Sequence, residues 1–294
     1  MLKVPVSRPG RVLKDMMARG IVVMPGVFNP ISALSATNAG SQGLYLSGAG
    51  ISNAQFGVPD VGLVGLSEFA EQARRITSVV SVPVISDVDT GFGEAWNVMR
   101  TVIEMEGSGV AGIHLEDQVI PKRCGHLDGK TLVGALEMVT KLKAAIHSRK
   151  DPDFLLIART DARGVEGLEK AIDRARAYEG CGADMIFPEG LESESEFERF
   201  RSAISIPMLA NMTEFGKTPL ISVSKFADLG YQIVIFPMTA FRVMLKAMDE
   251  TYLEVIKEGS QKNIMNKMRT REELYKLIDY SEYENLDKKW GGKP

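Results

Sequence analysis

The chain has 294 residues, of which 45% are hydrophobic and 25% charged, close to the average of globular proteins. A formal net charge of -3 provides no general attraction to nucleic acid or acidic lipids, so we expect neither as a partner. The first ten residues lack the apolar run of a signal peptide, and no apolar segment is long enough to span a bilayer. The two cysteines are too few for a disulfide framework. We therefore expect a cytoplasmic protein that acts on small molecules.

Eight short apolar runs rich in β-branched residues recur along the chain, and amphipathic helical stretches lie between most of them. The expected strands are 21–27, 43–47, 82–87, 111–116, 154–160, 183–188, 206–211 and 231–237. The clearest helices are 66–79, 94–108, 132–148, 167–179 and 193–203. Buried strands that alternate with helices are typical of a parallel sheet covered by helices.

Eight such units predict a closed (β/α)8 barrel of the TIM type. The alternative is an open doubly wound sheet, but no Gly-x-Gly-x-x-Gly turn follows the first strand. We expect one α/β-barrel domain over 1–294, with 260–294 as a C-terminal helical extension. Within 264–283 the pattern predicts a charged helix with apolar Leu274, Leu277 and Ile278, which another subunit would cover.

Barrel enzymes carry their chemistry at the C-terminal ends of the strands and in the loops that follow. Each polar residue there could alone be a helix cap or a solvated loop residue. Their gathering at one rim favours a functional site. The candidates are Ser47, Gly48, Ala49, Asp87, Asp89, Glu116, Asp117, Arg159, Thr160, Asp161, Glu189, Asn211, Met212 and Thr213, with Arg242 just beyond the eighth strand.

The segment 121–126, Pro-Lys-Arg-Cys-Gly-His, follows the fourth strand and delivers a thiol to the same rim. Cys124 stands beside Lys122 and Arg123 and near His126, and electropositive surroundings lower a thiol pKa. This predicts a group that exchanges its proton near neutral pH. The alternative is a basic surface loop with an incidental cysteine.

Asp87 and Asp89 are two residues apart, so on a strand their side chains would point the same way. A divalent cation would relieve their repulsion, and carboxylates with waters are typical ligands of Mg²⁺. We therefore expect Mg²⁺, with Glu116 supporting it through a water molecule or a hydrogen bond to one of its ligands. The alternative is that Asp89 opens a turn into Gly91 and Gly93. His114 is expected to be a hydrogen-bonded interior residue.

Taken together, the segments 47–49, 87–93, 115–118 and 122–126 resemble the isocitrate lyase and phosphoenolpyruvate mutase superfamily, over about residue 25 to the C-terminal helices. The Lys-Arg-Cys-Gly-His loop is similar to that of its methylisocitrate lyase branch, whereas isocitrate lyases have Lys-Lys-Cys-Gly-His and long insertions. The resemblance implies an α/β barrel in a homotetramer, with its last helix exchanged with a neighbouring subunit.

The resemblance also implies an Mg²⁺-dependent lyase, with Mn²⁺ as a substitute, that splits the tricarboxylate 2-methylisocitrate into pyruvate and succinate in propionate catabolism. Cys124 would protonate the carbanion, Arg159 would stabilise negative charge, Tyr45 is the candidate hydroxyl base, and His126 is a further catalytic candidate. The substrate-binding residues implied are Ser47, Gly48, Ala49, Gly125, Glu189, Asn211, Thr213, Arg242 and Arg271.

Phe187 and Ile235 would line the pocket for the extra methyl group, where isocitrate lyases tend to have tryptophan and threonine. Other activities of the superfamily are the alternatives: isocitrate cleavage, oxaloacetate hydrolysis and phosphonomutase chemistry. A binding protein on an inactive barrel is disfavoured because both the acidic pair and the cysteine are present.

Overall fold

The computed structural model describes residues 6–291, and its centre is a barrel of eight parallel strands in the order β6-β5-β4-β3-β2-β1-β8-β7. A bridge between Ile186 and Met208, with Ile186 N donating to Pro207 O at 3.0 Å, joins the two ends of this order. The predicted barrel is confirmed, and each strand is slightly shorter than its apolar run. The strands are β1 Val22–Val27, β2 Leu44–Leu46, β3 Val84–Asp87, β4 Gly112–Glu116, β5 Leu155–Thr160, β6 Met185–Pro188, β7 Leu209–Asn211 and β8 Ile233–Phe236.

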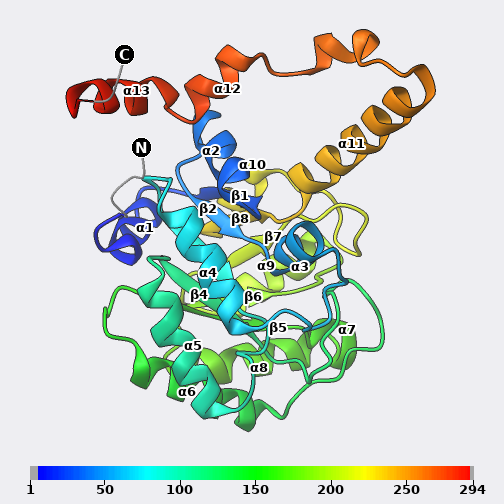
Figure 1. Cartoon of the computed structure of the whole chain (residues 1–294). Helices are drawn as coiled ribbons and strands as arrows, with labels where there is room; N and C mark the ends of the chain where they lie inside the picture. The colour runs from blue at the N-terminus through cyan, green and yellow to red at the C-terminus, as the bar shows by residue number, and fades with distance from the viewer. Residues whose placement is uncertain (1–5, 292–294) are drawn as a thin grey trace.

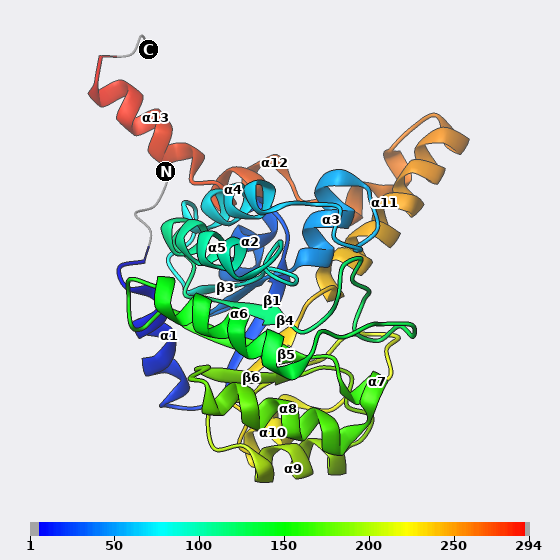
Figure 2. The same ribbon diagram turned by 90° about the horizontal axis from the view of Figure 1, so that it is seen from below.

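Helices surround the barrel and cover its outer face (Figures 1 and 2). None of the helices in the described part of the chain is long and apolar enough to cross a membrane. The helices before the last strand are α1 Pro9–Met17, α2 Pro30–Asn38, α3 Gly48–Phe56, α4 Leu66–Thr77, α5 Ala95–Gly107, α6 Ala135–Ser148, α7 Arg163–Glu166, α8 Leu168–Gly180, α9 Glu194–Ala203 and α10 Val223–Asp228.

The core has two parts, because successive strand residues point to opposite faces. Outward-facing strand residues pack under the helices in the larger cluster, with Phe69 and Phe197 from the helices. The inward-facing residues fill the barrel and include Tyr45, Phe187 and Ile235. The barrel interior is therefore packed mainly with apolar side chains, and charged side chains gather at its rim.

The C-terminal segment leaves the barrel. Helix α11 (Thr239–Glu258) has 20 residues, none of them buried, and it extends away from the body (Figure 1). The chain then returns through η1 (Lys262–Lys267) to α12 (Arg271–Leu277), which contacts α2, and ends in α13 (Tyr280–Lys289). Figure 2 shows α11 and α13 diverging, α11 toward the right and α13 toward the left of the view.

The single helix expected over 264–283 is wrong. Thr270 starts α12 with a capping box, in which its hydroxyl accepts from Glu273 N at 3.1 Å. Asp279 adopts a left-handed conformation, with φ of 55°, which separates α12 from α13. The ends of the expected domain, 1–5 and 292–294, lie outside the described residues.

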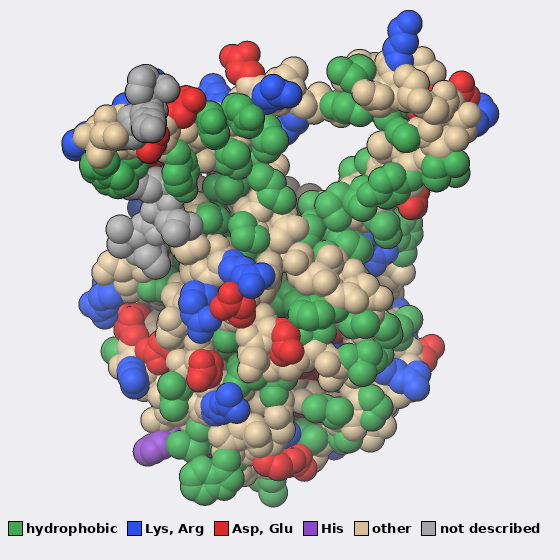
Figure 3. Space-filling model, in the orientation of Figure 1, with side chains coloured by type: hydrophobic (Ala, Val, Ile, Leu, Met, Phe, Trp, Pro, Cys, Tyr) green, Lys and Arg blue, Asp and Glu red, His purple; other side chains and the backbone are tan. Residues whose placement is uncertain are grey.

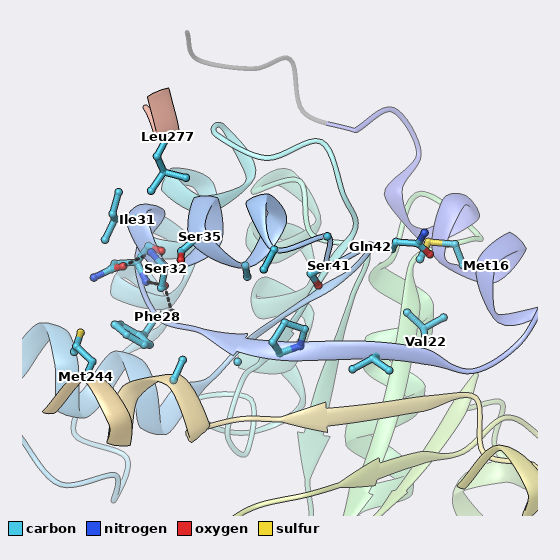
Figure 4. Close-up of a pocket in the computed structure, with 18 of the residues that line it drawn as sticks. Met16, Val22, Phe28, Ile31, Ser32, Ser35, Ser41, Gln42, Met244 and Leu277 are labelled. Carbon is cyan, nitrogen blue, oxygen red and sulfur yellow. Dashed lines mark hydrogen bonds between the residues drawn. The ribbon is translucent and has the colours of Figure 1, made fainter. Parts of the chain in front are cut away.

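A groove with a cavity volume of about 1070 Å³ opens where α11 departs. It is lined by outward-facing residues of β1 and by α2, α11 and α12, among them Val23, Phe28, Met244 and Leu277 (Figure 4). Val23 on the outer face of β1 is 40% exposed. In the space-filling view an opening separates the C-terminal arm from the body (Figure 3). This part of the barrel thus lacks the helical cover that the other strands have.

Candidate active site

Charged and polar side chains gather where the strands end, because parallel strands bring their C-terminal ends to one rim. β3 ends at Asp87, β4 at Glu116 and β7 at Asn211, while Glu189 follows β6 directly. Arg159 is the penultimate residue of β5. These side chains are at most 9% exposed, so their charges meet in a region from which water is largely excluded.

Arg159 is the centre of this cluster. Its Nε lies 3.0 Å from Asp161 Oδ2 and 3.2 Å from Glu116 Oε2, and its Nη1 lies 3.6 Å from Glu189 Oε2. The guanidinium also lies over the ring of Phe187, 5.2 Å from the centroid. Contacts on several sides fix the orientation of a cation that cannot lose its charge.

Glu189 is held by donors from three elements. Asn211 Nδ2 donates to Glu189 Oε2 at 3.0 Å, and His126 Nε2 lies 3.0 Å from Glu189 Oε1. Burial raises the pKa of Glu189, but Arg159 and the hydrogen bonds from His126 and Asn211 outweigh it and hold the pKa well below its ordinary value. Glu189 is therefore a permanent carboxylate that orients its donors.

Asp87 and Asp89 are not two residues on the same face of a strand, so that prediction is wrong, although the two residues are in contact. β3 ends at Asp87, and Asp89 stands in a left-handed turn with φ of 47°, as the turn alternative expected. Asp87 Oδ1 accepts a hydrogen bond from Asp89 N at 2.9 Å. A Cβ on Gly48 would lie 2.5 Å from Asp87 Oδ2, so only glycine leaves this carboxylate its space.

Lys122 faces these acids and not the thiol that it was expected to activate. Its ammonium is buried and lies 2.6 Å from Asp89 Oδ1 and 2.5 Å from Asp60 Oδ1. The sequence pattern does not point to Asp60, because this residue lies in the loop after α3, away from any strand end. No periodic or spacing signal marks that loop.

The acids outnumber the cations that face them. Burial raises the pKa of Asp89 to about 7 despite Lys122, and burial raises the pKa of Glu116 well above its ordinary value despite Arg159. Glu116 Oε1 is buried without a hydrogen-bond partner among the described residues, and Asp89 Oδ1 is paired with the ammonium of Lys122, which Asp60 shares. No group of three His, Cys, Asp or Glu side chains in residues 6–291 is already arranged for a metal. The buried acidic oxygens nevertheless fit a hard cation.

Tyr45 points into the barrel. Its hydroxyl lies 2.8 Å from His114 Nε2, and His114 Nδ1 lies 3.7 Å from Asp87 Oδ1. Burial and the charge of Asp87 raise the pKa of Tyr45 well above its ordinary value, whereas burial lowers the pKa of His114 to about 4. His114 is thus the hydrogen-bonded interior residue that was expected, and it also belongs to the site.

Cys124 lies on the loop between β4 and α6, with its side chain exposed. The next residue is pressed onto the cluster, since a Cβ on Gly125 would lie 2.2 Å from Glu189 Cγ. The expected low thiol pKa is wrong. Displaced water raises the pKa of Cys124, and the charge of Glu189 adds to the rise, while the His126 backbone N–H and Arg159 oppose it. At neutral pH the sulfur carries its proton.

Several expected residues lie at the edge of the cluster. Ser47 caps α3 by accepting from Gly50 N at 3.1 Å, and neighbouring Ala49 is half-buried. Thr213 is half-buried after β7. Arg242 stacks over the ring of Phe215 with 5.4 Å to the centroid.

Three further expectations concern residues outside the charged cluster. Arg271 is exposed at the start of α12, a helix that contacts α2 and α13, so this chain does not bring it to the site. Phe187 and Ile235 are fully buried inside the barrel. Phe187 packs edge-on against His114, with ring centroids 5.3 Å apart.

Comparison with known proteins identifies the family of the chain. The family model described as phosphoenolpyruvate phosphomutase matches residues 13–256. The chain is 54% identical to the 2-methylisocitrate lyase of Aeropyrum pernix over 96% of this chain and 91% of that protein. Among solved structures it is similar to oxaloacetate acetylhydrolase, with a TM-score of 0.91 and 33% identity over 99% of each chain.

A second solved structure, 2,3-dimethylmalate lyase, is described as a member of the PEP mutase/isocitrate lyase superfamily. It aligns with a TM-score of 0.90 and 34% identity, over 98% of this chain and 96% of its own. The family match ends at residue 256, whereas these three relatives align over 96–99% of the chain, C-terminal arm included. The chain belongs to the phosphoenolpyruvate phosphomutase family, within the isocitrate lyase/phosphoenolpyruvate mutase superfamily.

Proposed function

We propose that the protein is a carbon–carbon lyase that cleaves 2-methylisocitrate into pyruvate and succinate. The observation that carries this assignment is the place of Cys124, on a loop that Gly125 seats against Arg159 and Glu189. The raised pKa of the thiol supports it, because the sulfur then keeps its proton at neutral pH. The relatives named 2-methylisocitrate lyase, at 42–54% identity, support the choice of substrate. A proton donor is what a lyase of this kind needs, because cleavage leaves a carbanion.

The reaction balances with one proton removed and one supplied. Loss of the hydroxyl proton at C2 turns this carbon into the ketone of pyruvate, and the electrons of the C2–C3 bond go to C3. Cys124 gives its proton to C3 and so completes succinate. Arg159, fixed between Glu116 and Asp161, offers its charge to the developing oxyanions.

Tyr45 is the candidate that receives the hydroxyl proton. Its raised pKa means that it is a neutral phenol at rest, so it has to pass on its own proton as it accepts another. The hydrogen bond of 2.8 Å to His114 Nε2 provides the acceptor, and the charge of Asp87 opposes the burial that lowers the pKa of His114. In this scheme Tyr45 and His114 act as one relay, and Asp87 beside His114 Nδ1 stabilises the proton after transfer.

The superfamily is one of metal-dependent lyases, and for this chain we propose Mg²⁺, with Mn²⁺ as a substitute. Asp87 and Asp89 would hold the metal, and Glu116 would support it, since these buried acids outnumber the cations that face them and Glu116 Oε1 lacks a partner among the described residues. When bound, the metal supplies Lewis-acid polarisation of the substrate hydroxyl. Lys122 meanwhile neutralises part of the charge on Asp89.

We also propose that a second copy of the chain covers the groove beside β1. Leu245, Met248, Tyr252 and Ile256 lie at helical spacing on one face of α11, and each is exposed. A helix of 20 residues with no buried residue is not stable without a partner for such a face. The arm and the groove occur on the same chain, so two copies can exchange them, and pairs of such dimers make a homotetramer.

The thiol chemistry requires a reduced cysteine, and both cysteines of the chain are free. A reducing compartment keeps such thiols reduced, which is why we place the protein in the cytoplasm.

Incubation of the purified protein with 2-methylisocitrate and, separately, with isocitrate tests the assignment, with pyruvate, glyoxylate and succinate measured. Parallel reactions contain Mg²⁺, Mn²⁺ or excess chelator. We expect pyruvate and succinate in equal amounts from 2-methylisocitrate, and no turnover with chelator. Release of oxalate and acetate from oxaloacetate without cleavage of 2-methylisocitrate would instead establish a hydrolase. Full activity in excess chelator would show that the reaction does not require a metal.

A further inference from the structure

Two buried side chains outside the chemistry hold the backbone on either side of Cys124. The first is Gln118, which is 1% exposed and follows β4 by two residues. Its Nε2 donates to Arg123 O at 2.8 Å, and its Oε1 accepts from Arg123 N at 2.9 Å. One amide therefore satisfies both polar backbone groups of Arg123, the residue before the thiol. This fixes the direction in which the chain enters Cys124.

The second is Lys130, whose side chain is 3% exposed. Its ammonium donates to Gly125 O and lies 3.7 Å from Asp161 Oδ1. Lysine is among the residues least often buried, because removing its charge from water is costly unless the charge is paired. Here the pairing is with the carbonyl after Cys124 and with a fully buried carboxylate.

The same carboxylate orients Arg159. Asp161 Oδ2 accepts from Arg159 Nε at 3.0 Å, and Asp161 Oδ1 accepts from Arg159 Nη2 at 3.2 Å. Asp161 N in turn donates to Asp117 Oδ1 at 2.9 Å, which anchors it to the end of β4. Lys130 thus connects the residue after the thiol to the group that fixes the catalytic guanidinium.

We propose that Gln118 and Lys130 are positioning residues that set the place of the Cys124 thiol relative to the carbon it protonates. With residues 123 and 125 both held, rotation of the side chain is the main freedom left to Cys124, although its surface is exposed. Proton transfer requires the two heavy atoms to approach closely, and a displacement of about 1 Å can cost about 100-fold in rate. The inference rests on the proposed function, in which Cys124 is the proton donor.

The test uses the full-length protein and two variants of matched shape. Gln118→Glu keeps the acceptor for Arg123 N but loses the donor to Arg123 O, and Lys130→Met keeps most of the stem but loses the ammonium. Asp128→Asn is the control, because Asp128 lies on the same loop and its exposed carboxylate binds Lys217. We expect kcat for 2-methylisocitrate to fall about 10- to 100-fold in the two variants, with KM changed less than about threefold. Asp128→Asn should stay near wild type.

A solvent isotope effect separates positioning from a general loss of structure. If the donor is displaced, protonation becomes slower than cleavage, so the effect of D2O on kcat should increase in Gln118→Glu and Lys130→Met and not in the control. Lys130→Arg, which keeps a charged donor, should recover part of kcat. An unchanged isotope effect, or losses that appear only in KM, would overturn the proposal. If one variant does not fold by circular dichroism, the other decides.

Alkylation of Cys124 by iodoacetamide, measured by mass spectrometry without substrate, is independent of the reaction. Release of the loop should move the thiol away from Glu189, whose charge helps to keep the proton on the sulfur, and so speed its alkylation in both variants relative to wild type and Asp128→Asn. Equal alkylation rates in all four proteins would contradict the positioning role. If the wild type did not cleave 2-methylisocitrate, the proposed function would fall, while this comparison would still decide whether Gln118 and Lys130 hold the loop.

Discussion

Cys124 differs from an ordinary surface cysteine in what surrounds it. The cations next to it in sequence predicted a lowered thiol pKa, but Lys122 contacts Asp60 and Asp89 instead. Loss of water around the sulfur raises the thiol pKa, and the charge of Glu189 adds to the rise. A protonated thiol has no use as a nucleophile but is ready to donate its proton. Burial and charge at this residue thus favour acid catalysis.

The first prediction is that Cys124→Ser lowers kcat by at least about 100-fold, because a hydroxyl is a much weaker acid than a thiol. KM should change little, since the loop is held by Gln118 and Lys130 and not by the sulfur. Pyruvate release in a coupled assay measures both parameters. Cys181→Ser serves as the control, because Cys181 lies at the end of α8, remote from the rim. A serine variant with more than about a tenth of the wild-type kcat would refute the role of Cys124.

The second prediction concerns the methyl group of the substrate. Phe187 and Ile235 lie buried in the barrel beneath the cluster, with Phe187 under Arg159. A Phe187→Trp, Ile235→Thr double variant adds bulk and a hydroxyl there, so it should narrow the preference for 2-methylisocitrate over isocitrate. One methyl group is worth about 1–3 kcal/mol in an apolar pocket. The ratio of the two kcat/KM values measures the change, and an unaltered ratio would show that these residues do not determine specificity.

At the scale of elements, the site depends on how closely a loop can approach the strands. Gly125 lets the Cys124 loop rest on Glu189, and Gly216 lets the loop after β7 rest on His126, where a Cβ would lie 2.6 Å from Nδ1. Lys217 N donates to His126 Nδ1 at 3.1 Å and joins the two loops. The two loops can therefore pack against each other and against the rim because glycine has no side chain at these two contacts.

The third prediction is that Gly125→Ala lowers kcat about 10- to 100-fold with little loss of thermal stability. Overpacking costs about 1–3 kcal/mol, and a loop can avoid this cost by lifting away from the rim. Gly134→Ala is the matched control, because a Cβ at that position meets nothing within 4 Å. Kinetic assays and thermal unfolding of both variants make the comparison. A Gly125→Ala variant as active as wild type would show that activity does not require the loop to pack closely against Glu189.

The sequence predicted the elements well, because the barrel depends on local patterns. Apolar runs located all eight strands, and the strand ends located Asp87, Glu116 and Asn211. Long-range pairing was not accessible in the same way. Nothing near Lys122 in sequence reveals that Asp60 is its partner. The two-residue separation of Asp87 and Asp89 is the same whether Asp89 continues the strand or lies in a turn, so the spacing could not distinguish the two. His114 looked like a core residue because its partner Tyr45 is 69 positions away.

At the scale of the whole molecule, the unsupported arm is the main feature that a single chain leaves unexplained. The apolar face of α11 and the groove beside β1 are each exposed, and burying both would stabilise an assembly by the hydrophobic effect. Arg271 lies on the same arm and away from the site of its own chain. If the arms are exchanged, Arg271 lies nearer to the site of the partner subunit than to the site of its own chain.

The fourth prediction is that Leu245→Asp, Ile256→Asp reduces the oligomer to a smaller species, because two charges would enter the apolar contact. Lys257→Gln, on the opposite face of α11, should leave the assembly intact. Size-exclusion chromatography with light scattering gives the mass of each protein, and we expect a tetramer for wild type. A wild type that is monomeric at working concentration, or an unaffected double variant, would contradict the exchange of arms.

The central claim is that this barrel is a lyase for 2-methylisocitrate. The most direct measurement compares kcat/KM of the wild type for 2-methylisocitrate, isocitrate, oxaloacetate and phosphonopyruvate under one set of conditions with Mg²⁺. We predict the highest value for 2-methylisocitrate, roughly 10- to 200-fold above isocitrate, the range that one methyl group in an apolar pocket provides. An equal or higher kcat/KM for any of the other three substrates would contradict the assignment.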